Sequence, residues 1–93
     1  MTENEEILYA AANSESTAGL LRMVQKIRKL TFLDLARKTG LHRNTISYIF
    51  SGDRINSARL KDLDKICHAM DCELRIELIP LINTTYQNPS IKR

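Results

Sequence analysis

The sequence lacks several features that would place it in other classes of protein. It has only two cysteines, Cys67 and Cys72, with no companion set of histidines, so it offers neither a disulfide framework nor a metal site. We interpret both as core thiols. No apolar run approaches the ~20 residues of a membrane span, and the first six residues are acidic where a secretory signal is basic. We therefore expect a soluble, intracellular protein of the cytoplasm, with no membrane partner.

The signatures of common enzymes are also missing. The three glycines form no phosphate-binding loop, and no carboxylate pair, serine or cysteine stands beside a candidate base. We expect no catalytic residue, no metal ligand and no cofactor. The length of 93 residues suits one domain with a single modest hydrophobic core. These absences favour a binding protein over an enzyme.

The charged residues are unevenly distributed along the chain. The overall net charge is +3, and four glutamates lie within the first fifteen residues. Between positions 16 and 71, eleven lysines and arginines stand against five aspartates, an excess of six positive charges. Such an excess suits a polyanionic partner, although a solvated charged surface is the ordinary alternative.

Hydrophobic periodicity predicts a mainly helical chain. Residues 3–12 favour a helix by propensity, so the segment 1–15 is either a short helix or a disordered arm. Apolar residues spaced three and four apart then predict helices from 16 or 17 to about 29, from 31 to 40, from about 43 to 50, and from 56 or 57 to about 70. Gly40 and Gly52 stand where two of these helices are expected to end.

Residues 31–51 have the spacing of two short helices joined by a sharp turn. Thr31 and Asp34 form the Thr-x-x-Asp pattern of a capping box, and Gly40 supplies the turn. Ile46 and its apolar neighbours are placed to form the wedge that fixes the angle between the helices. In a helix-turn-helix, the first helix lies across the DNA backbone and the second enters the major groove.

This segment resembles the core of the Cro/C1, or Xre, family of helix-turn-helix regulators: Thr31-Phe-Leu-Asp-Leu-Ala-Arg-Lys-Thr-Gly-Leu-His-Arg-Asn-Thr-Ile-Ser-Tyr-Ile-Phe-Ser-Gly52. Its most specific part is Leu-Ala-x-x-x-Gly-Leu-x-x-x-Thr-Ile-Ser, and the resemblance extends to about residue 79. It implies a lambda-repressor-like domain of about five helices over residues 16–80, dimeric operator binding and transcriptional repression. Residues 81–93 are expected to be a flexible tail.

The resemblance assigns DNA contacts to the second helix of the pair. The family's contacting positions correspond here to His42, Arg43, Asn44, Ser47 and Tyr48. Arg43 can form a bidentate pair with guanine and Asn44 with adenine, whereas His42 has the alternative role of a helix cap. Phosphate contacts are expected from Thr31, Arg37, Lys38, Ser51 and Arg54. A solvated helix face is the alternative interpretation of these positions.

The sequence departs from the family pattern at two places. Phe32 stands where the family usually carries a glutamine that bonds a phosphate, and phenylalanine cannot form that bond. The link at residues 28–31 looks short and lacks the common glycine, so the position of the preceding helix is less defined. Phe32 is the main argument for an alternative function, a protein-interaction module with weak or no DNA binding.

After Asp71 the hydrophobic period changes. Charged and apolar residues alternate over residues 73–78, which predicts a strand with Leu74, Ile76 and Leu78 on its buried face. A solitary strand leaves its backbone polar groups unpaired, so we expect a C-terminal dimerisation β-strand in which residues 72–79 of two copies pair antiparallel. The alternatives are a strand on the edge of its own domain and an extra helical turn.

A strand after the last helix is similar in layout to the HipB-type antitoxins, which are small Xre proteins. Those proteins dimerise through the strand, repress their own operon and bind a kinase toxin. The likeness implies a homodimer on a palindromic double-stranded DNA operator, with a toxin protein as a further partner. Either the N-terminal segment or the C-terminal tail is where we expect such a protein to dock.

Overall fold

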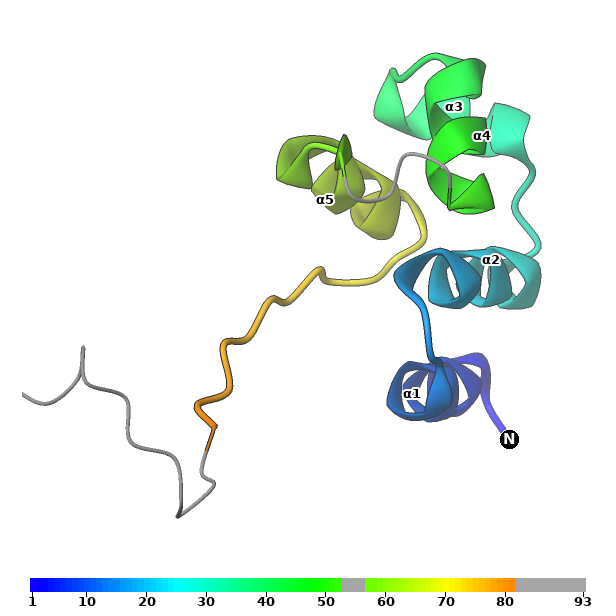
Figure 1. The fold of residues 1–93 in the computed structure, drawn as a ribbon. Helices are drawn as coiled ribbons and strands as arrows, with labels where there is room; N and C mark the ends of the chain where they lie inside the picture. The colour runs from blue at the N-terminus through cyan, green and yellow to red at the C-terminus, as the bar shows by residue number, and fades with distance from the viewer. Residues whose placement is uncertain (53–56, 82–93) are drawn as a thin grey trace, which may run out of the picture.

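The computed structural model describes residues 1–52 and 57–81. Within these ranges the chain forms five α-helices and no strand (Figure 1). The helices are α1 (Glu3–Asn13), α2 (Thr17–Arg28), α3 (Phe32–Thr39), α4 (Arg43–Ser51) and α5 (Leu60–Ala69). None of them is both long enough and apolar enough to cross a bilayer. The mainly helical, five-helix fold expected from the sequence is confirmed.

The N-terminal segment is a helix and not a disordered arm. The Thr2 hydroxyl accepts a hydrogen bond from the Glu5 N–H at 3.1 Å, and the Glu5 carboxylate accepts one from the Thr2 N–H at 2.9 Å. The Thr2 N–H, followed by the Thr2 hydroxyl contact, holds the pKa of the Glu5 carboxylate below its ordinary value. Such a capping box satisfies N–H groups at the helix start that have no partner within the helix. α1 packs against α2 below the other helices of Figure 1.

The hydrophobic core lies between the four later helices. Contacts join α2 to α4, α3 to α4, and α3 to α5. Five core side chains on α3, α4 and α5 or at the end of α5 are at most 1% exposed: Leu35, Ile46, Phe50, Ile66 and Met70. These positions follow the spacing of three and four residues that predicted the helices. Burial of the inner faces fixes α3 and α4 relative to each other.

Local hydrogen bonds set both ends of α3. The Thr31 hydroxyl accepts from the Asp34 N–H at 3.0 Å, and the Asp34 carboxylate accepts from the Thr31 N–H at 2.9 Å, so the predicted capping box is confirmed. α3 ends at Gly40, which has φ +77°, a conformation that glycine adopts without a Cβ penalty. The turn at Gly40 leads directly into α4.

The link between α2 and α3 makes its turn without a glycine. Lys29 takes the left-handed conformation instead, with φ +58°. The Lys29 N–H bonds the Lys26 carbonyl, and the Leu30 N–H bonds the Gln25 carbonyl, both at 3.1 Å. This pair of bonds is a Schellman motif, which closes α2 as a glycine would. The missing glycine therefore leaves the packing of α2 intact.

The start of α5 differs from the prediction. The helix begins at Leu60, with Arg59 as its N-cap, and not at residue 56 or 57. The Arg59 side chain makes no capping hydrogen bond, so the sequence carries no capping signal at this boundary. The helix that follows keeps the predicted apolar face, on which Ile66 is fully buried and Cys67 is buried.

The predicted strand does not form within the chain. Residues 72–81, which we call the arm, run away from the helices as extended chain without strand hydrogen bonds to another described residue (Figure 1). Leu74 packs against the core, whereas Ile76 is 60% and Leu78 is 95% exposed. An edge strand and an extra helical turn are both wrong for this segment, because residues 73–81 have neither helical nor strand structure and the described residues offer no neighbouring strand. Apart from Leu81, the expected tail lies outside the described residues.

Candidate nucleic-acid interface

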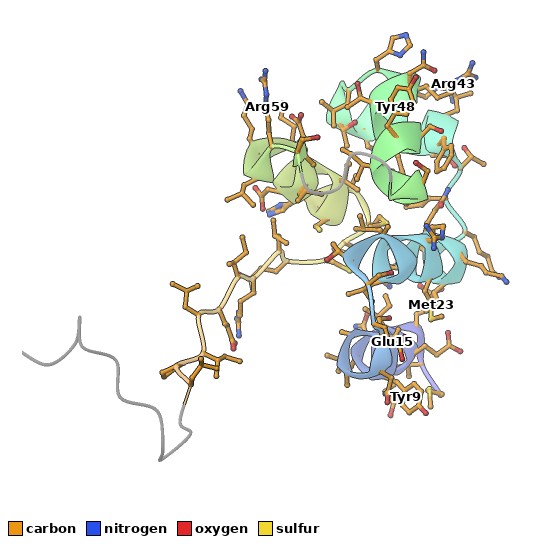
Figure 2. All side chains as sticks on the ribbon, viewed as in Figure 1. Tyr9, Glu15, Met23, Arg43, Tyr48 and Arg59 are labelled. Atoms are coloured by element: carbon orange, nitrogen blue, oxygen red, sulfur yellow. The ribbon has the colours of Figure 1, made fainter. Side chains whose placement is uncertain are left out.

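α4 has one face in the core and one on the surface. Ile46, Ile49 and Phe50 are at most 3% exposed. Residues three and four apart are neighbours on a helix, so one outer face carries four of the predicted contacts: Arg43, Asn44, Ser47 and Tyr48. Ser47 is half-buried and the other three are exposed. Figure 2 shows Arg43 and Tyr48 on the side of the molecule opposite α1.

His42 acts as the N-cap of α4. Its Nδ1 accepts a hydrogen bond from the Asn44 N–H at 3.0 Å, so the alternative role of a helix cap is confirmed. The cap satisfies one of the free N–H groups of the first turn and thereby orders it. His42 is itself exposed beside Arg43 and Asn44. The residue stands at the tip of the outer face and also supports it.

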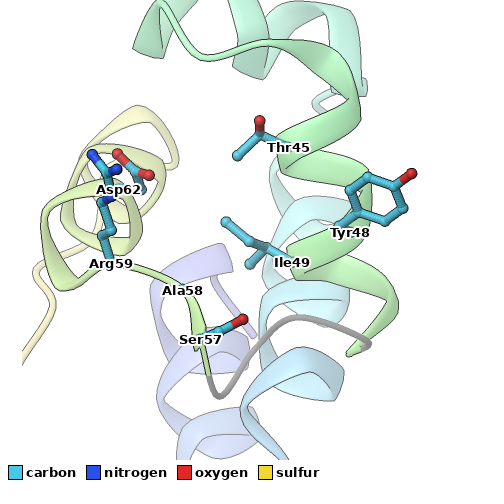
Figure 3. A pocket seen from close by; sticks show the side chains of 7 residues that line it. All are labelled: Thr45, Tyr48, Ile49, Ser57, Ala58, Arg59 and Asp62. Carbon is cyan, nitrogen blue, oxygen red and sulfur yellow. The ribbon is translucent and has the colours of Figure 1, made fainter.

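A pocket of about 180 Å³ lies between α4 and the start of α5 (Figure 3). Thr45 and Ile49 point from α4 toward α5, whereas Tyr48 points away from α5. The Tyr48 side chain is 49% exposed. Tyr48 thus directs its polar end toward the outer surface, where a base edge or a phosphate can be met.

Arg59 is a candidate contact that the sequence reasoning missed. It is exposed, lines this pocket and precedes the first turn of α5. A guanidinium group and a helix N-terminus both attract a phosphate, although the Asp62 carboxylate in the same pocket opposes an anion. The sequence signal for this contact was a basic residue shortly after the second helix of the pair. Because the next helix was predicted to start at residue 56 or 57, Arg59 was placed inside that helix.

Phe32 packs against the core and makes an aromatic contact within the helix pair. Its ring lies edge-on to the ring of Phe50, with centroids 5.3 Å apart and an interplanar angle of 73°. It is half-buried against the core. Edge-to-face pairs of this kind contribute about 0.5–1.5 kcal/mol beyond area burial. Where the family usually has a polar anchor to DNA, this chain has an apolar anchor between the start of α3 and the end of α4.

Four other predicted contacts are divided between the two ends of the helix pair. Arg37 and Lys38 are exposed in the last turn of α3, close in sequence to the start of α4. Thr31 and Ser51 lie at the opposite end, which the aromatic pair holds together. Both hydroxyl groups take part in helix-end hydrogen bonds, Thr31 as an acceptor and Ser51 as a donor. Arg54 lies outside the described residues.

Not every basic residue of the central stretch faces outward. Arg22 donates a hydrogen bond to the Phe50 carbonyl at the end of α4. Arg28 donates to the carbonyls of Met70 at 2.9 Å and Asp71 at 3.3 Å, after the end of α5. Both guanidinium groups stabilise helix ends, where the carbonyls lack partners within the helix. Arg22 stays exposed, whereas Arg28 is half-buried and paired with Glu3, so Arg28 contributes less of the counted positive charge to a polyanion.

The sequence of the helical part matches a known family. Residues 21–75, more than half of the chain, match the Cro/C1-type HTH DNA-binding domain. The chain belongs to this family. The Cro/C1-type domain includes α3 and α4, so the resemblance seen in residues 31–52 is confirmed and a DNA-binding regulator is supported. No curated protein and no solved structure was found to match the chain.

The Cro/C1-type domain does not include the whole described chain. α1 precedes the matched residues, and the arm from residue 76 onward follows them. In the described part of the chain, no three side chains of histidine, cysteine, aspartate or glutamate are placed to hold a metal ion together. The outer face of α4 is thus the surface on which the family's function is best tested.

Proposed function

We propose that the protein is a sequence-specific regulator that binds double-stranded DNA through the outer face of α4. The observation that carries the proposal is the division of α4 into a fully packed inner face and an outer face with four hydrogen-bonding side chains. A rigid helix of this kind enters the major groove, where each base pair presents its own pattern of donors and acceptors.

Each side chain on that face has chemistry suited to base edges. Arg43 donates two hydrogen bonds to guanine, and Asn44 forms a donor-acceptor pair with adenine. Ser47 and Tyr48 complete the face, with Tyr48 reaching a base edge or a phosphate. His42 holds the first turn in place through its hydrogen bond to the Asn44 N–H. The first turn of α4 therefore carries the base-specific contacts.

Anchoring to the DNA backbone relies on residues other than position 32. Phe32 is engaged with Phe50 and cannot donate to a phosphate. Arg37 and Lys38 in the last turn of α3 and Arg59 at the start of α5 offer exposed positive charge. Phosphate contacts fix the register of a protein on the duplex, and their loss weakens binding to all sequences alike.

A fluorescence titration of the full chain against its own upstream DNA tests the proposal, at two salt concentrations and with scrambled DNA as competitor. We expect a specific complex whose affinity falls steeply with salt. Arg43→Ala and Asn44→Ala each lower the specific binding by about 1–3 kcal/mol, because a bidentate base contact is lost. Lys26→Ala, which removes one exposed charge from α2, is the control. If neither α4 variant changes the preference for upstream DNA, the assignment of α4 is wrong.

We also propose that the protein acts as a homodimer through the arm. Alternate arm residues Leu74, Ile76 and Leu78 are apolar, and exposure of Ile76 and Leu78 at 60% and 95% is unfavourable in water. Antiparallel pairing of two arms gives their backbone groups partners and covers these side chains. Two copies of α4 then meet half-sites about 34 Å apart on a palindromic operator, and an operator of this kind upstream of the protein's own gene makes it an autorepressor.

Light scattering across a dilution series tests the dimer. Ile76→Pro removes a backbone donor from the middle of the arm, so we expect a monomer at all concentrations. Glu77→Thr, next to it and on the opposite side of the extended chain, is the control and retains self-association. A persistent Ile76→Pro dimer contradicts pairing through the arm.

A second candidate function is binding to another protein, as in HipB-type antitoxins. The observation that favours it is α1, which lies outside the family match and exposes Leu8 at 70% and Tyr9 at 66%. If the adjacent gene encodes a toxin, we expect its product to bind the intact chain. We expect the same product to bind the Tyr9→Ser variant more weakly than the wild type. If the chain forms such a complex and shows no sequence-specific DNA binding, protein interaction is its main function.

A further inference from the structure

The end of α5 brings the two cysteines of the chain together. Asp71 has φ +58°, and its N–H bonds the His68 carbonyl at 2.9 Å. The Cys72 N–H bonds the Cys67 carbonyl, also at 2.9 Å. The two bonds define a Schellman motif, in which the side chains of the first and last residues regularly contact each other. Those two residues are Cys67 and Cys72.

The backbone geometry suits a disulfide between them. The Cα of Cys72 is bonded to the donor nitrogen, and the Cα of Cys67 to the carbonyl carbon of the acceptor. The bond angles at the amide nitrogen and at the carbonyl carbon fold the path through this 2.9 Å hydrogen bond, so the two Cα atoms lie closer together than about 7 Å. This separation lies within the limit beyond which a disulfide requires movement of the backbone.

The two thiols have different surroundings. Cys67 is 8% exposed, and burial, followed by the nearby charges of Cys72 and Asp64, raises its pKa to about 11. Cys72 is only half-buried, and its thiol donates to the Met70 carbonyl at 3.5 Å. The pKa of Arg28 is raised above its ordinary value, mainly by the hydrogen bond to Glu3 and to a smaller extent by interaction with Cys72. One sulfur is thus accessible beside a cation, and the other is protected.

We propose that Cys67 and Cys72 are a redox-active dithiol that a hydroperoxide converts into an intramolecular disulfide, which weakens the pairing of two arms. With hydrogen peroxide as the hydroperoxide, the Cys72 thiolate attacks one peroxide oxygen, the O–O bond breaks, hydroxide departs and takes up a proton to become water, and Cys72 becomes a sulfenic acid. The Cys67 sulfur gives up its proton and attacks the Cys72 sulfur, and the S–O bond breaks to release water. In total, two thiols lose two hydrogens, and hydrogen peroxide becomes two waters.

The disulfide acts on the arm because Cys72 is its first residue. Bonding to Cys67 takes the Cys72 sulfur away from the Met70 carbonyl and from Arg28. Leu74 lies on the same side of the extended arm as Cys72 and packs on the core, so turning Cys72 inward disturbs that contact. This effect on pairing rests on the dimer of the proposed function, whereas formation of the disulfide does not.

The disulfide is tested by treating the full chain with hydrogen peroxide, blocking free thiols with iodoacetamide and measuring the intact mass. We expect both thiols to disappear together, with no added oxygen and no covalent dimer, and to return with dithiothreitol. Cys72→Ser and Cys67→Ala, which has a small apolar replacement suited to the core, each abolish the intramolecular bond. Retention of both thiols, irreversible addition of oxygen or cross-linking between chains overturns the proposal.

The effect on pairing is tested by light scattering across dilution of the reduced and the oxidised chain. We expect the oxidised dimer to dissociate at a several-fold higher concentration, and peroxide-treated Cys72→Ser to behave like the reduced wild type. Equal dissociation of the two wild-type forms overturns the regulatory half. If the reduced chain is monomeric throughout, the arm dimer itself is wrong, and the thiol assay still decides whether the disulfide forms.

Discussion

The helical body from α2 to α5 and the arm use the same apolar residue types with opposite results. In the body, Leu35, Ile46 and Ile66 are fully buried, whereas in the arm Ile76 and Leu78 are 60% and 95% exposed. A helix buries its apolar face against other helices of the same chain, but an alternating segment requires a neighbouring strand. The body pattern therefore specifies the fold, whereas the arm pattern finds no partner among the described residues and supports the association proposed above.

The largest expected effect is that of Phe50→Ala in the body. The change removes the largest fully buried side chain and its edge contact with Phe32, so the free energy of unfolding falls by about 3–5 kcal/mol. Urea unfolding followed by circular dichroism measures it. Ile76→Ala in the arm is the matched change, and its effect disappears on dilution, because it acts only through the dimer. An equal loss of unfolding free energy for Ile76→Ala at high dilution contradicts the difference between body and arm.

Removal of an arginine has a smaller effect that also differs between the regions. The Arg28 side chain is 15% exposed and bonds Glu3 and the backbone after α5, so Arg28→Met lowers the free energy of unfolding by about 2 kcal/mol. Arg75→Met in the arm breaks an ion pair with Glu73 whose side chains are 71% and 74% exposed. We expect that loss to be about 0–0.5 kcal/mol. Thermal and urea unfolding of both variants at one dilute concentration measures the difference.

Gly40→Ala tests the turn that joins α3 to α4. A Cβ at Gly40 meets no atom within 4 Å, so its effect comes from φ +77° alone, about 1–2 kcal/mol of lost stability. Lys29→Gly should change stability in the opposite direction and by less, because it relieves the positive φ of a side-chain-bearing residue. Urea unfolding measures both. A stabilising Gly40→Ala contradicts the conformation of this turn.

The smallest expected effect depends on pH. The Thr31 N–H, followed by the Thr31 hydroxyl contact and the charges of Arg37 and Lys38, holds the pKa of Asp34 below its ordinary value. The carboxylate therefore stabilises α3 fully above its unfolded pKa, and the benefit is lost as pH falls through the lower folded pKa, below about pH 4. Unfolding at several pH values should show Asp34→Asn approaching the wild type in acid. A stability difference between Asp34→Asn and the wild type that grows in acid contradicts the stabilising role of the carboxylate.

Local signals in the sequence predicted most of the body. The capping box of Thr31 and Asp34, the stop at Gly40 and the inner face of α4 each depend on residues within a few positions of one another. The outer face of α4 followed from the same helical spacing. Helix formation and capping are local, so these features are readable without a structure.

Contacts between distant residues were outside the reach of the sequence. The absence of a phosphate bond at Phe32 was predicted, but its contact with Phe50 requires the packed helix pair. The hydrogen bonds of Arg22 and Arg28 to distant carbonyls likewise depend on the tertiary structure. The alternation in the arm was read correctly as a pattern, but a strand also needs a partner that this chain does not supply within the described residues.

Arg28 connects α1 to the root of the arm through a single side chain. Its guanidinium bonds Glu3 and Asn4 at the start of α1 and the carbonyls of Met70 and Asp71 beside the arm. An opening motion that breaks this group of bonds releases α1 and the root of the arm together. Amide hydrogens of both segments should then exchange with solvent through one cooperative opening, at a lower free energy than those in the interior of α4.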